Sequence, residues 1–340
     1  MKVFHYHFGK DGGAERFFTH LVAGLGRHGI EQTAVIRPDR AWRPLVSDHA
    51  TIIESHFRNL SPDRLLLPWR IKRRVARERP DAMLAWMPKG AKLMPAWPGA
   101  HKIARLGDYP LRLKYFDHID TLVCNTPGIA DHVRNIGWTR RVEVITNFTR
   151  EGRVEPVDRS RYGVGPDDFL ITTMGRFVPR KGFATLIDAV ASDPSFHLWI
   201  MGDGELRDEL TDQANTLGVA ERVRFLGWQQ DTRPFVAAGD VFAAASSHEP
   251  LGNIILEAWA QGKPVVSTRS EGPSWFMSDE KDGLMVPIGD SEAFVAAFQR
   301  LKADAGLRDR IAAGGMETLA SRFSEDAICR QYLDLFADKP

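Results

Sequence analysis

Cysteine is scarce in this 340-residue sequence, which contains only Cys124 and Cys329. Two isolated cysteines provide neither a disulfide framework nor a four-ligand zinc site. The sequence also lacks the ~18 uninterrupted apolar residues of a membrane-spanning helix, and its first eight residues do not have the pattern of a signal peptide. We therefore expect a cytoplasmic protein, with the inner face of the cytoplasmic membrane as a second place of action.

A large excess of one charge is also missing. Lys and Arg number 45 against 44 Asp and Glu, so the formal net charge is +1. Nucleic-acid-binding proteins usually carry a strong basic excess, and we therefore expect no nucleic-acid partner. The length favours two domains, because one domain usually has roughly 100 to 200 residues.

Short apolar runs alternate with helical stretches in two successive series along the chain. This alternation is typical of α/β domains in which helices cover both faces of a parallel sheet. The predicted strands are 2–8, 33–36, 82–86, 121–124 and 142–146, then 169–174, 197–201, 223–225, 240–244 and 264–267. The polar segment 150–168 is the candidate linker. We place one domain at 1–152, a second at 153–323 and a final helix at 324–340, with Ser324 as its N-cap.

The sequence Gly24-Leu25-Gly26-Arg27-His28-Gly29 matches the dinucleotide-binding fingerprint letter for letter. That fingerprint binds a pyrophosphate only where a strand ends and a helix begins. Here the glycines lie at the end of the predicted helix 14–27, where glycine is common as a cap. We interpret them as structural, which makes a nicotinamide oxidoreductase the weakest of the functions considered.

The turn 9–15 stands where that fingerprint would be expected, between the first strand and the first helix. Gly12 and Gly13 in this turn would allow a ligand to approach the backbone closely. Tight turns also use glycine without any ligand, so both interpretations stay open for this turn.

Two cations, Arg176 and Lys181, follow the predicted strand 169–174. Ligands of open parallel sheets bind at the carboxyl ends of the strands. Arginine can bond a phosphate through two donors and lysine acts as a point charge, so the pair suits a diphosphate. A solvated basic loop is the alternative.

Two carboxylates, Glu249 and Glu257, flank a second candidate ligand-binding turn, which follows the predicted strand 240–244. Pro250 and Gly252 mark the turn, so Glu249 should lie in the loop and Glu257 about one turn inside a helix. The backbone amides at the start of that helix, around Leu251, Gly252 and Asn253, would favour an anion or sugar oxygens. Carboxylates accept hydrogen bonds from paired sugar hydroxyls.

Together these residues resemble the retaining glycosyltransferases of the GT-B fold, specifically the group 1, or family 4, enzymes that include bacterial lipopolysaccharide and mannosyl transferases. The resemblance covers nearly the whole chain. It is strongest at Gly175-Arg176 with Lys181-Gly182, at Met201-Gly202-Asp203-Gly204, at Phe225-Leu226-Gly227, at the segment from Glu249 to Glu257 and at the turn Gly12-Gly13-Ala14-Glu15.

The resemblance implies two Rossmann-like doubly wound domains that face each other across a cleft. The first would bind the acceptor and the second the nucleotide sugar, with the final helix crossing back to the first. It also implies the following roles. Arg176 and Lys181 would bind the donor diphosphate, Glu249 the donor sugar and Glu257 the ribose.

The remaining candidate residues also take their roles from the resemblance. Gly12 and Gly13 would approach the phosphate from the first domain. Gly227 and Trp228 fall where the family contacts the base, although the indole could equally belong to the core. Many relatives have a histidine near the reacting carbon, whereas the matching loop here offers Asp108 as its best substitute.

The implied reaction is metal-independent transfer with retention of configuration, from a UDP- or GDP-linked donor to a glycan or lipid-linked acceptor. No Asp-x-Asp motif occurs in the chain, so we expect Arg176 and Lys181 to replace a divalent ion, and no cofactor. A second loop of the family often ends in Pro-Glu or Gly-Pro-x-Glu, but here Trp275 takes the place of that glutamate. Bacterial cell-surface polysaccharide or lipopolysaccharide synthesis is the expected setting.

Two further patterns concern possible partners. The stretch from Arg64 to Arg79 interleaves apolar residues, Leu65 among them, with arginines, which suits either weak contact with an anionic membrane or a core-packing helix with a solvated basic face. We favour the second interpretation. His5 and His7 alternate with aromatic residues on the first strand, and we expect them to be structural rather than metal ligands.

Three other functions remain as alternatives to transfer: a GT-B epimerase, a phosphorylase, and a non-catalytic or regulatory protein that binds sugar nucleotides. Release of nucleotide diphosphate only in the presence of an acceptor would distinguish transfer from the first two. The sequence predicts no oligomeric state.

Overall fold

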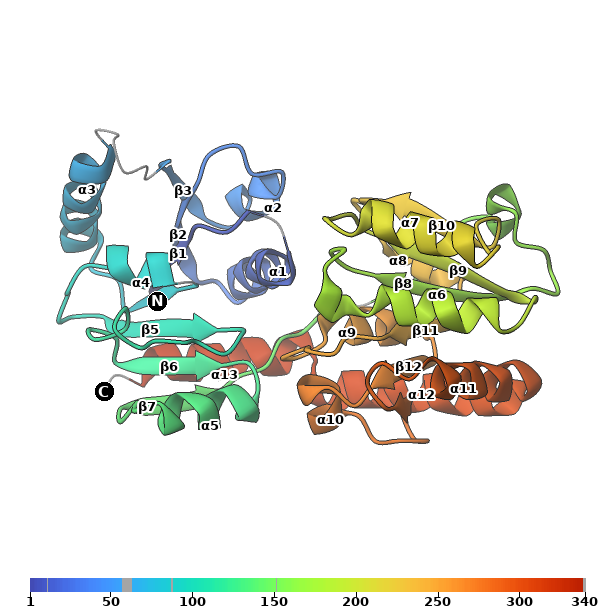
Figure 1. Cartoon of the computed structure of the whole chain (residues 1–340). Coiled ribbons are helices and arrows are strands. Elements are labelled where there is room, and N and C mark those ends of the chain that lie inside the picture. Colours follow the sequence, from blue (N-terminus) through green and yellow to red (C-terminus); the bar gives the residue numbers. More distant parts are fainter. Residues whose placement is uncertain (11, 57–62, 87, 151, 339–340) are drawn as a thin grey trace. The chain divides into compact units, whose positions relative to one another are not determined.

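The computed structural model describes residues 1–10, 12–56, 63–86, 88–150 and 152–338. Asp11 of the glycine turn and the side chains of Arg64 and Leu65 lie outside the described parts. The chain forms two compact units (Figure 1). The first comprises Met1–Phe148 together with Ser324–Pro340, and the second comprises Thr149–Phe323.

The first unit contains a parallel sheet, which has seven strands within the described residues, in the order β3-β2-β1-β4-β5-β6-β7. The strands are β1 (Lys2–His7), β2 (Glu31–Ile36), β3 (Thr51–Glu54), β4 (Ala82–Ala85), β5 (His101–Leu106), β6 (Thr121–Cys124) and β7 (Arg141–Val144). The helices are α1 (Gly13–Arg27), α2 (Arg43–Ser47), α3 (Asp63–Glu78), α4 (Pro88–Leu93), α5 (Pro127–Asn135) and α13 (Glu325–Ala337).

Alternation along the strands places apolar side chains on both faces of this sheet. On β1, Val3 packs with α1, α2 and α13, whereas Phe4 and Tyr6 pack with α3, α4 and α5. Both layers are buried, because a parallel sheet is covered by helices on its two faces. The chain's final helix, α13, drawn in red, lies against this sheet (Figure 1).

The second unit contains a parallel sheet with six strands within the described residues, in the order β10-β9-β8-β11-β12-β13. The strands are β8 (Phe169–Met174), β9 (Phe196–Met201), β10 (Val223–Gly227), β11 (Val241–Ala244), β12 (Val265–Thr268) and β13 (Leu284–Val286). The helices are α6 (Phe183–Ala191), α7 (Arg207–Thr216), α8 (Arg233–Ala238), α9 (Asn253–Ala260), α10 (Glu271–Phe276), α11 (Ser291–Ala303) and α12 (Ala305–Arg322), with short 3-10 turns η1 (Arg159–Tyr162) and η2 (Pro179–Lys181).

The ten strands predicted from the sequence are all present, with ends that shift by at most two residues. Three further strands, β3, β5 and β13, were not predicted. The segment 150–168 is no free linker, because it includes η1 and Arg159, whose guanidinium contacts Asp240 at 3.1 Å and the carbonyl oxygen of Gly165 at 2.8 Å.

The fingerprint-like glycines do lie at the end of a helix, as predicted. Gly24 and Gly26 belong to the last turns of α1, and Gly29 follows the helix with a φ of 75°. A Cβ atom at Gly24 would lie 2.6 Å from the sulfur of Cys329 on α13. Gly24 is thus required for the close packing of two helices, and the structural interpretation is confirmed.

The final helix begins as its sequence predicts. The Ser324 hydroxyl accepts a hydrogen bond from the backbone amide of Ala327 and so caps α13. One face of the helix is buried in the first unit; it consists of Ile328, Cys329, Tyr332, Leu335 and Phe336. Among the described residues, no helix combines the length and the apolar character needed to cross a bilayer.

Candidate active site

The carboxyl ends of the strands in the second unit form a set of loops that are tied together by their backbones. Ser247 donates a backbone hydrogen bond of 2.8 Å to Arg180, and Gly202 donates one of 2.8 Å to Gly227. A Cβ atom at Gly202 would lie 1.9 Å from the carbonyl oxygen of Gly175, and one at Gly182 would lie 2.1 Å from that of Ala245. Glycine is therefore required where these loops touch, and the loop after β8 is held on both sides.

This loop carries Arg176 and Lys181, the two cations predicted from the sequence. The Lys181 ammonium forms an ion pair with the carboxylate of Glu249, and the two side chains are only 15% and 16% exposed. The Glu249 carboxylate also accepts a hydrogen bond of 3.2 Å from the hydroxyl of Ser246. Arg176, by contrast, is exposed and forms no ion pair within the described ranges. The site thus offers one paired and one unpaired cation.

The backbone of Glu249 is held by the first residues of α10. Its amide donates to a carboxylate oxygen of Glu271 at 3.1 Å, and its carbonyl accepts from the amide of Gly272 at 2.9 Å. The other carboxylate oxygen of Glu271 lies 2.8 Å from Nδ1 of His248. These contacts hold the backbone of the Glu249 loop in position without a ligand.

Helix α9 begins at Asn253, as predicted, and its N-cap residue is Gly252 with a φ of 101°. Gly252 has no side chain, so the first amides of the helix are not capped from that position. Glu257 lies one turn further on, half-buried, with its carboxylate 3.5 Å from the hydroxyl of Thr232. Amides and carboxylate are therefore presented by the same short helix.

Gly227 and Trp228 follow at the end of β10. Gly227 has a φ of 68°, a conformation that favours glycine. Trp228 is 60% exposed, so the interpretation of its indole as a core residue is wrong. An exposed indole beside the ligand-binding edge of a sheet offers a flat surface for a planar group.

In the first unit, the glycine turn before α1 is filled by a side chain of its own helix. Gly12 has a φ of 155°, and Gly13 is the first residue of α1. A Cβ atom at Gly9 would lie 1.6 Å from a carboxylate oxygen of Glu15, which is buried in the first turn. An acidic side chain is favourable at a helix N-terminus. Gly9 is therefore required for a structural reason, because a side chain at this position would collide with the Glu15 carboxylate.

Asp108 lies in the exposed loop after β5. Its carboxylate accepts a hydrogen bond of 2.8 Å from the amide of Tyr109, which orients the start of the next segment. Three residues earlier, Arg105 is buried, bonds Asn147, and lies 4.6 Å from the ring centre of Phe17. Burial lowers the pKa of the Arg105 guanidinium from its usual value.

His5 and His7 are buried on β1 and contact other side chains or backbone, as expected for structural histidines. Nε2 of His5 lies 3.0 Å from Oε1 of Gln32, and Nδ1 of His7 accepts from the amide of Gly9 at 3.0 Å. Burial lowers the pKa of His5 to about 4 and that of His7 to about 3. The described residues contain no cluster of three or more His, Cys, Asp or Glu that could hold a metal ion.

Sequence reasoning missed Ser246, His248, Glu271 and Arg105. The first three are ordinary polar residues, two in a loop and Glu271 at the start of α10, and their contacts depend on which strands become neighbours in the sheet. Arg105 did give a signal, because a charged residue inside the apolar run 103–106 is unusual and points to a buried polar contact.

Comparisons with known proteins agree with the resemblance. The pattern of the family described as "Glycosyl transferases group 1" matches residues 168–304. The chain is 59% identical over 340 residues to the lipopolysaccharide core biosynthesis glycosyltransferase LpsE of Rhizobium meliloti (strain 1021), with both chains fully covered. It is 50% identical over 336 residues to LpsD of the same organism, covering 99% of this chain and 98% of LpsD.

Solved structures support the predicted fold. The crystal structure of Anabaena Alr3699/HepE in complex with UDP and glucose superimposes with a TM-score of 0.84 at 22% identity, covering 99% of both chains. The prediction of two Rossmann-like units of the GT-B type is thereby confirmed. The chain belongs to the group 1 glycosyl transferases and is a glycosyltransferase.

Proposed function

We propose that this enzyme transfers a sugar from a UDP- or GDP-linked donor to a glycan or lipid-linked acceptor in synthesis of the lipopolysaccharide core. The 59% identity with LpsE over the full length carries the proposal for the pathway. The complex of HepE with UDP and glucose supports a nucleotide-sugar donor, and UDP is the first to test.

In the proposed arrangement, the second unit binds the donor. Arg176 and Lys181 bind the diphosphate, together with the amides of Leu251, Gly252 and Asn253. The Lys181–Glu249 ion pair supports this assignment, since it places a cation and a hydroxyl acceptor side by side at the ligand-binding edge of the sheet. The donor would bind where it contacts both the Lys181 ammonium and the Glu249 carboxylate.

Three other residues of the second unit complete the proposed donor site. Glu257 accepts the ribose hydroxyls, and Gly227 and Trp228 bind the base. The exposure of the Trp228 indole supports this role, because a base can stack on it. The second unit, Thr149–Phe323, binds the donor, and the first unit, Met1–Phe148 with Ser324–Pro340, binds the acceptor and carries the candidate residues Gly12, Gly13 and Asp108.

The proposed reaction breaks the bond between the anomeric carbon and the diphosphate oxygen and forms a bond to the acceptor oxygen on the same face. The acceptor proton passes to the departing phosphate. Negative charge therefore grows on the diphosphate in the transition state, and fixed cations with helix-terminal amides stabilise it. Arg176 and Lys181 supply that charge without a divalent ion.

Substitution of the two glutamates tests these roles. Glu249→Gln and Glu249→Ala should lower kcat by roughly a hundredfold, because the contact to the transferred sugar strengthens as the bond breaks. Glu257→Gln should raise the donor KM and leave kcat nearly unchanged, as expected for loss of uniform binding. Release of UDP or GDP is measured with and without acceptor, and the 94% exposed Glu221 provides the control Glu221→Ala. Unchanged kcat in both Glu249 variants would contradict the assignment, as would release that needs no acceptor.

A further inference from the structure

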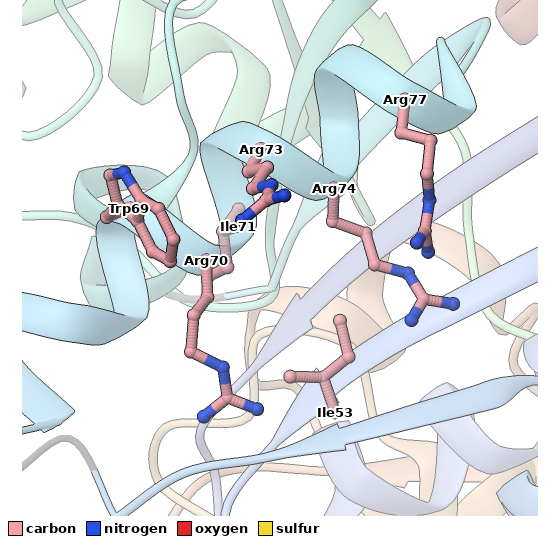
Figure 2. A pocket seen from close by; sticks show the side chains of 7 residues that line it. All are labelled: Ile53, Trp69, Arg70, Ile71, Arg73, Arg74 and Arg77. Atoms are coloured by element: carbon pink, nitrogen blue, oxygen red, sulfur yellow. The ribbon is translucent and has the colours of Figure 1, made fainter.

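A groove of about 530 Å³ lies between helix α3 and strand β3 of the first unit. Its lining combines four arginines with an aromatic and two aliphatic side chains. We call it the arginine groove; it is formed by Ile53, Trp69, Arg70, Ile71, Arg73, Arg74 and Arg77 (Figure 2). Its volume lies within the range of sites that hold small molecules.

Helix α3 has one face that packs in the core and another that carries this groove. Leu67, Ile71 and Val75 recur every four residues and are at most 1% exposed, so the interpretation as a core-packing helix is correct. The arginines follow a spacing of three, one and three residues and so share a second side of the helix, which adjoins the core-packing side at Ile71. Arg70, Arg74 and Arg77 extend toward the side where Ile53 lies (Figure 2).

The charge of the groove is only partly neutralised. Glu78 pairs with both Arg74 and Arg77. Arg70 and Arg73 form no ion pair with the residues that the structure describes, and the guanidinium of Arg73 lies 5.4 Å from the ring centre of Trp69. Like charges four residues apart destabilise a helix, so the stripe works against the stability of α3. The groove is therefore a local excess of positive charge in a chain whose net charge is only +1.

The exposed apolar residues beside the arginines add a second property. Trp69 is 58% exposed and Leu66 is 53% exposed, on the helix that buries Leu67, Ile71 and Val75. Arginine forks match the oxygens of a phosphate group, and an aromatic face suits a sugar ring or the glycerol region of a lipid. The groove therefore presents cations and apolar surface to one ligand.

We propose that the arginine groove binds a phosphate group carried by a sugar or a lipid head, with Arg70 and Arg73 as its main ligands. The proposal rests on the proposed function in one respect. It identifies the bound phosphate with an anionic group of the acceptor or of the membrane around the acceptor. Binding itself needs neither donor nor turnover. It can therefore fail or succeed independently of the transferase activity.

The test compares two sources of the same phosphate chemistry. The purified chain is titrated with glucose 6-phosphate and, separately, sedimented with vesicles of phosphatidylcholine containing phosphatidic acid. The same measurements are made on Arg70→Gln/Arg73→Gln and on the charge-preserving Arg70→Lys/Arg73→Lys. Lys72→Gln/Arg310→Gln is the matched control, because it also removes two exposed charges but leaves the groove intact.

The glutamine pair should weaken binding at least tenfold, since each cation contributes about 1 kcal/mol at an anionic surface. The lysine pair should also weaken it, because lysine lacks the bidentate fork. The control should stay within a factor of about three of the original chain. Binding of the sugar phosphate alone identifies a soluble or acceptor phosphate, and binding of vesicles alone identifies a lipid head; either outcome supports the groove.

Three outcomes would overturn the proposal. The original chain could bind neither probe, the lysine pair could bind as well as the original chain, or the control could lose as much binding as the glutamine pair. Either of the last two outcomes would mean that the arginine groove acts only as diffuse surface charge and not as a specific phosphate site. Circular dichroism of each variant guards against misfolding, and acceptor-dependent release of nucleotide diphosphate is recorded in parallel, so that a failed groove and a failed transferase give different results.

Discussion

At the scale of single residues, the loop that carries Glu249 depends on a neighbour that the family resemblance does not supply. Glu271 accepts the amide hydrogen of Glu249 and contacts His248 through its other oxygen. Helix α10, which begins at Glu271, departs from the family pattern at Trp275. The ring centre of Trp275 lies 6.2 Å from that of Phe276, and the guanidinium of Arg322 lies over the indole. Glu271 is therefore a positioning residue for Glu249, whereas Trp275 belongs to a local aromatic cluster.

Glu271→Ala should lower kcat/KM for the donor by roughly tenfold or more, because a small displacement of a substrate-positioning group is costly. Glu271→Gln keeps an oxygen that can accept from the Glu249 amide and should retain most of the activity. Steady-state kinetics with the exposed Glu221→Ala as control checks this. If the alanine and glutamine variants lost activity equally, the charge of Glu271 rather than its hydrogen bond to the Glu249 amide would be the important feature.

The sequence predicted where individual site residues lie relative to the strands, but it did not predict which residues they contact. Glu249 and Lys181 were each chosen for their place after a strand, and that place is confirmed. Their ion pair joins residues 68 positions apart and depends on β8 and β11 being neighbours, which no local pattern contains. His248 and Glu271 were missed for the same reason, since their partners come from the ends of β11 and β12.

At the scale of elements, ten of the thirteen strands in the described residues were predicted, and β3, β5 and β13 were missed. Strand β5 contains His101 and Arg105, which are buried through hydrogen bonds to Thr121 and Asn147. Apolar periodicity could not identify these residues as interior, because their partners come later in the chain; only the charge of Arg105 inside the apolar run 103–106 was a signal. Strand β13 has only three residues, too few to show a pattern. Strand β3 has four residues and lies at a sheet edge, but the predicted strand β7 shares both properties, so neither explains why β3 was missed.

Helix α13 should contribute to the stability of the first unit through its buried face. Phe336 is fully buried with α1 and the sheet, and Phe336→Ala should reduce the free energy of unfolding by about 3 to 5 kcal/mol. Gln331 lies on the exposed side of the same helix, so Gln331→Ala should change it by less than about 0.5 kcal/mol. Urea unfolding followed by circular dichroism measures both. Equal effects would mean that α13 does not contribute its buried face to the stable unit.

At the scale of the whole molecule, the two units repeat one design, and the sequence conveyed it because most strands are followed by a helix. Arg70 and Arg73 lie in the first unit and Lys181 with Glu249 in the second, so each unit has its own chemically distinct candidate site. The net charge alone does not reveal this distribution. It emerges only when the charges are placed on folded elements.

The buried histidines of β1 predict how the stability of the molecule depends on pH. Burial lowers the pKa of His5 to about 4 and of His7 to about 3, whereas the unfolded value is 6.5. Between these values the unfolded chain binds more protons than the folded one, so stability falls as pH falls below 6.5. From pH 7 to pH 5, each histidine should cost about 2 kcal/mol of unfolding free energy.

Urea unfolding at pH 7 and pH 5 measures this difference, and the His7→Gln variant isolates one contribution. The variant should lose about 2 kcal/mol of the pH-dependent difference, because glutamine does not titrate and its oxygen can accept from the Gly9 amide in place of Nδ1. His56 is exposed, so His56→Gln should leave the difference unchanged. A pH dependence as steep in His7→Gln as in the original chain would show that His7 is not neutral in the folded state, and that the Glu15 carboxylate, 3.9 Å from its Nε2, stabilises a proton there.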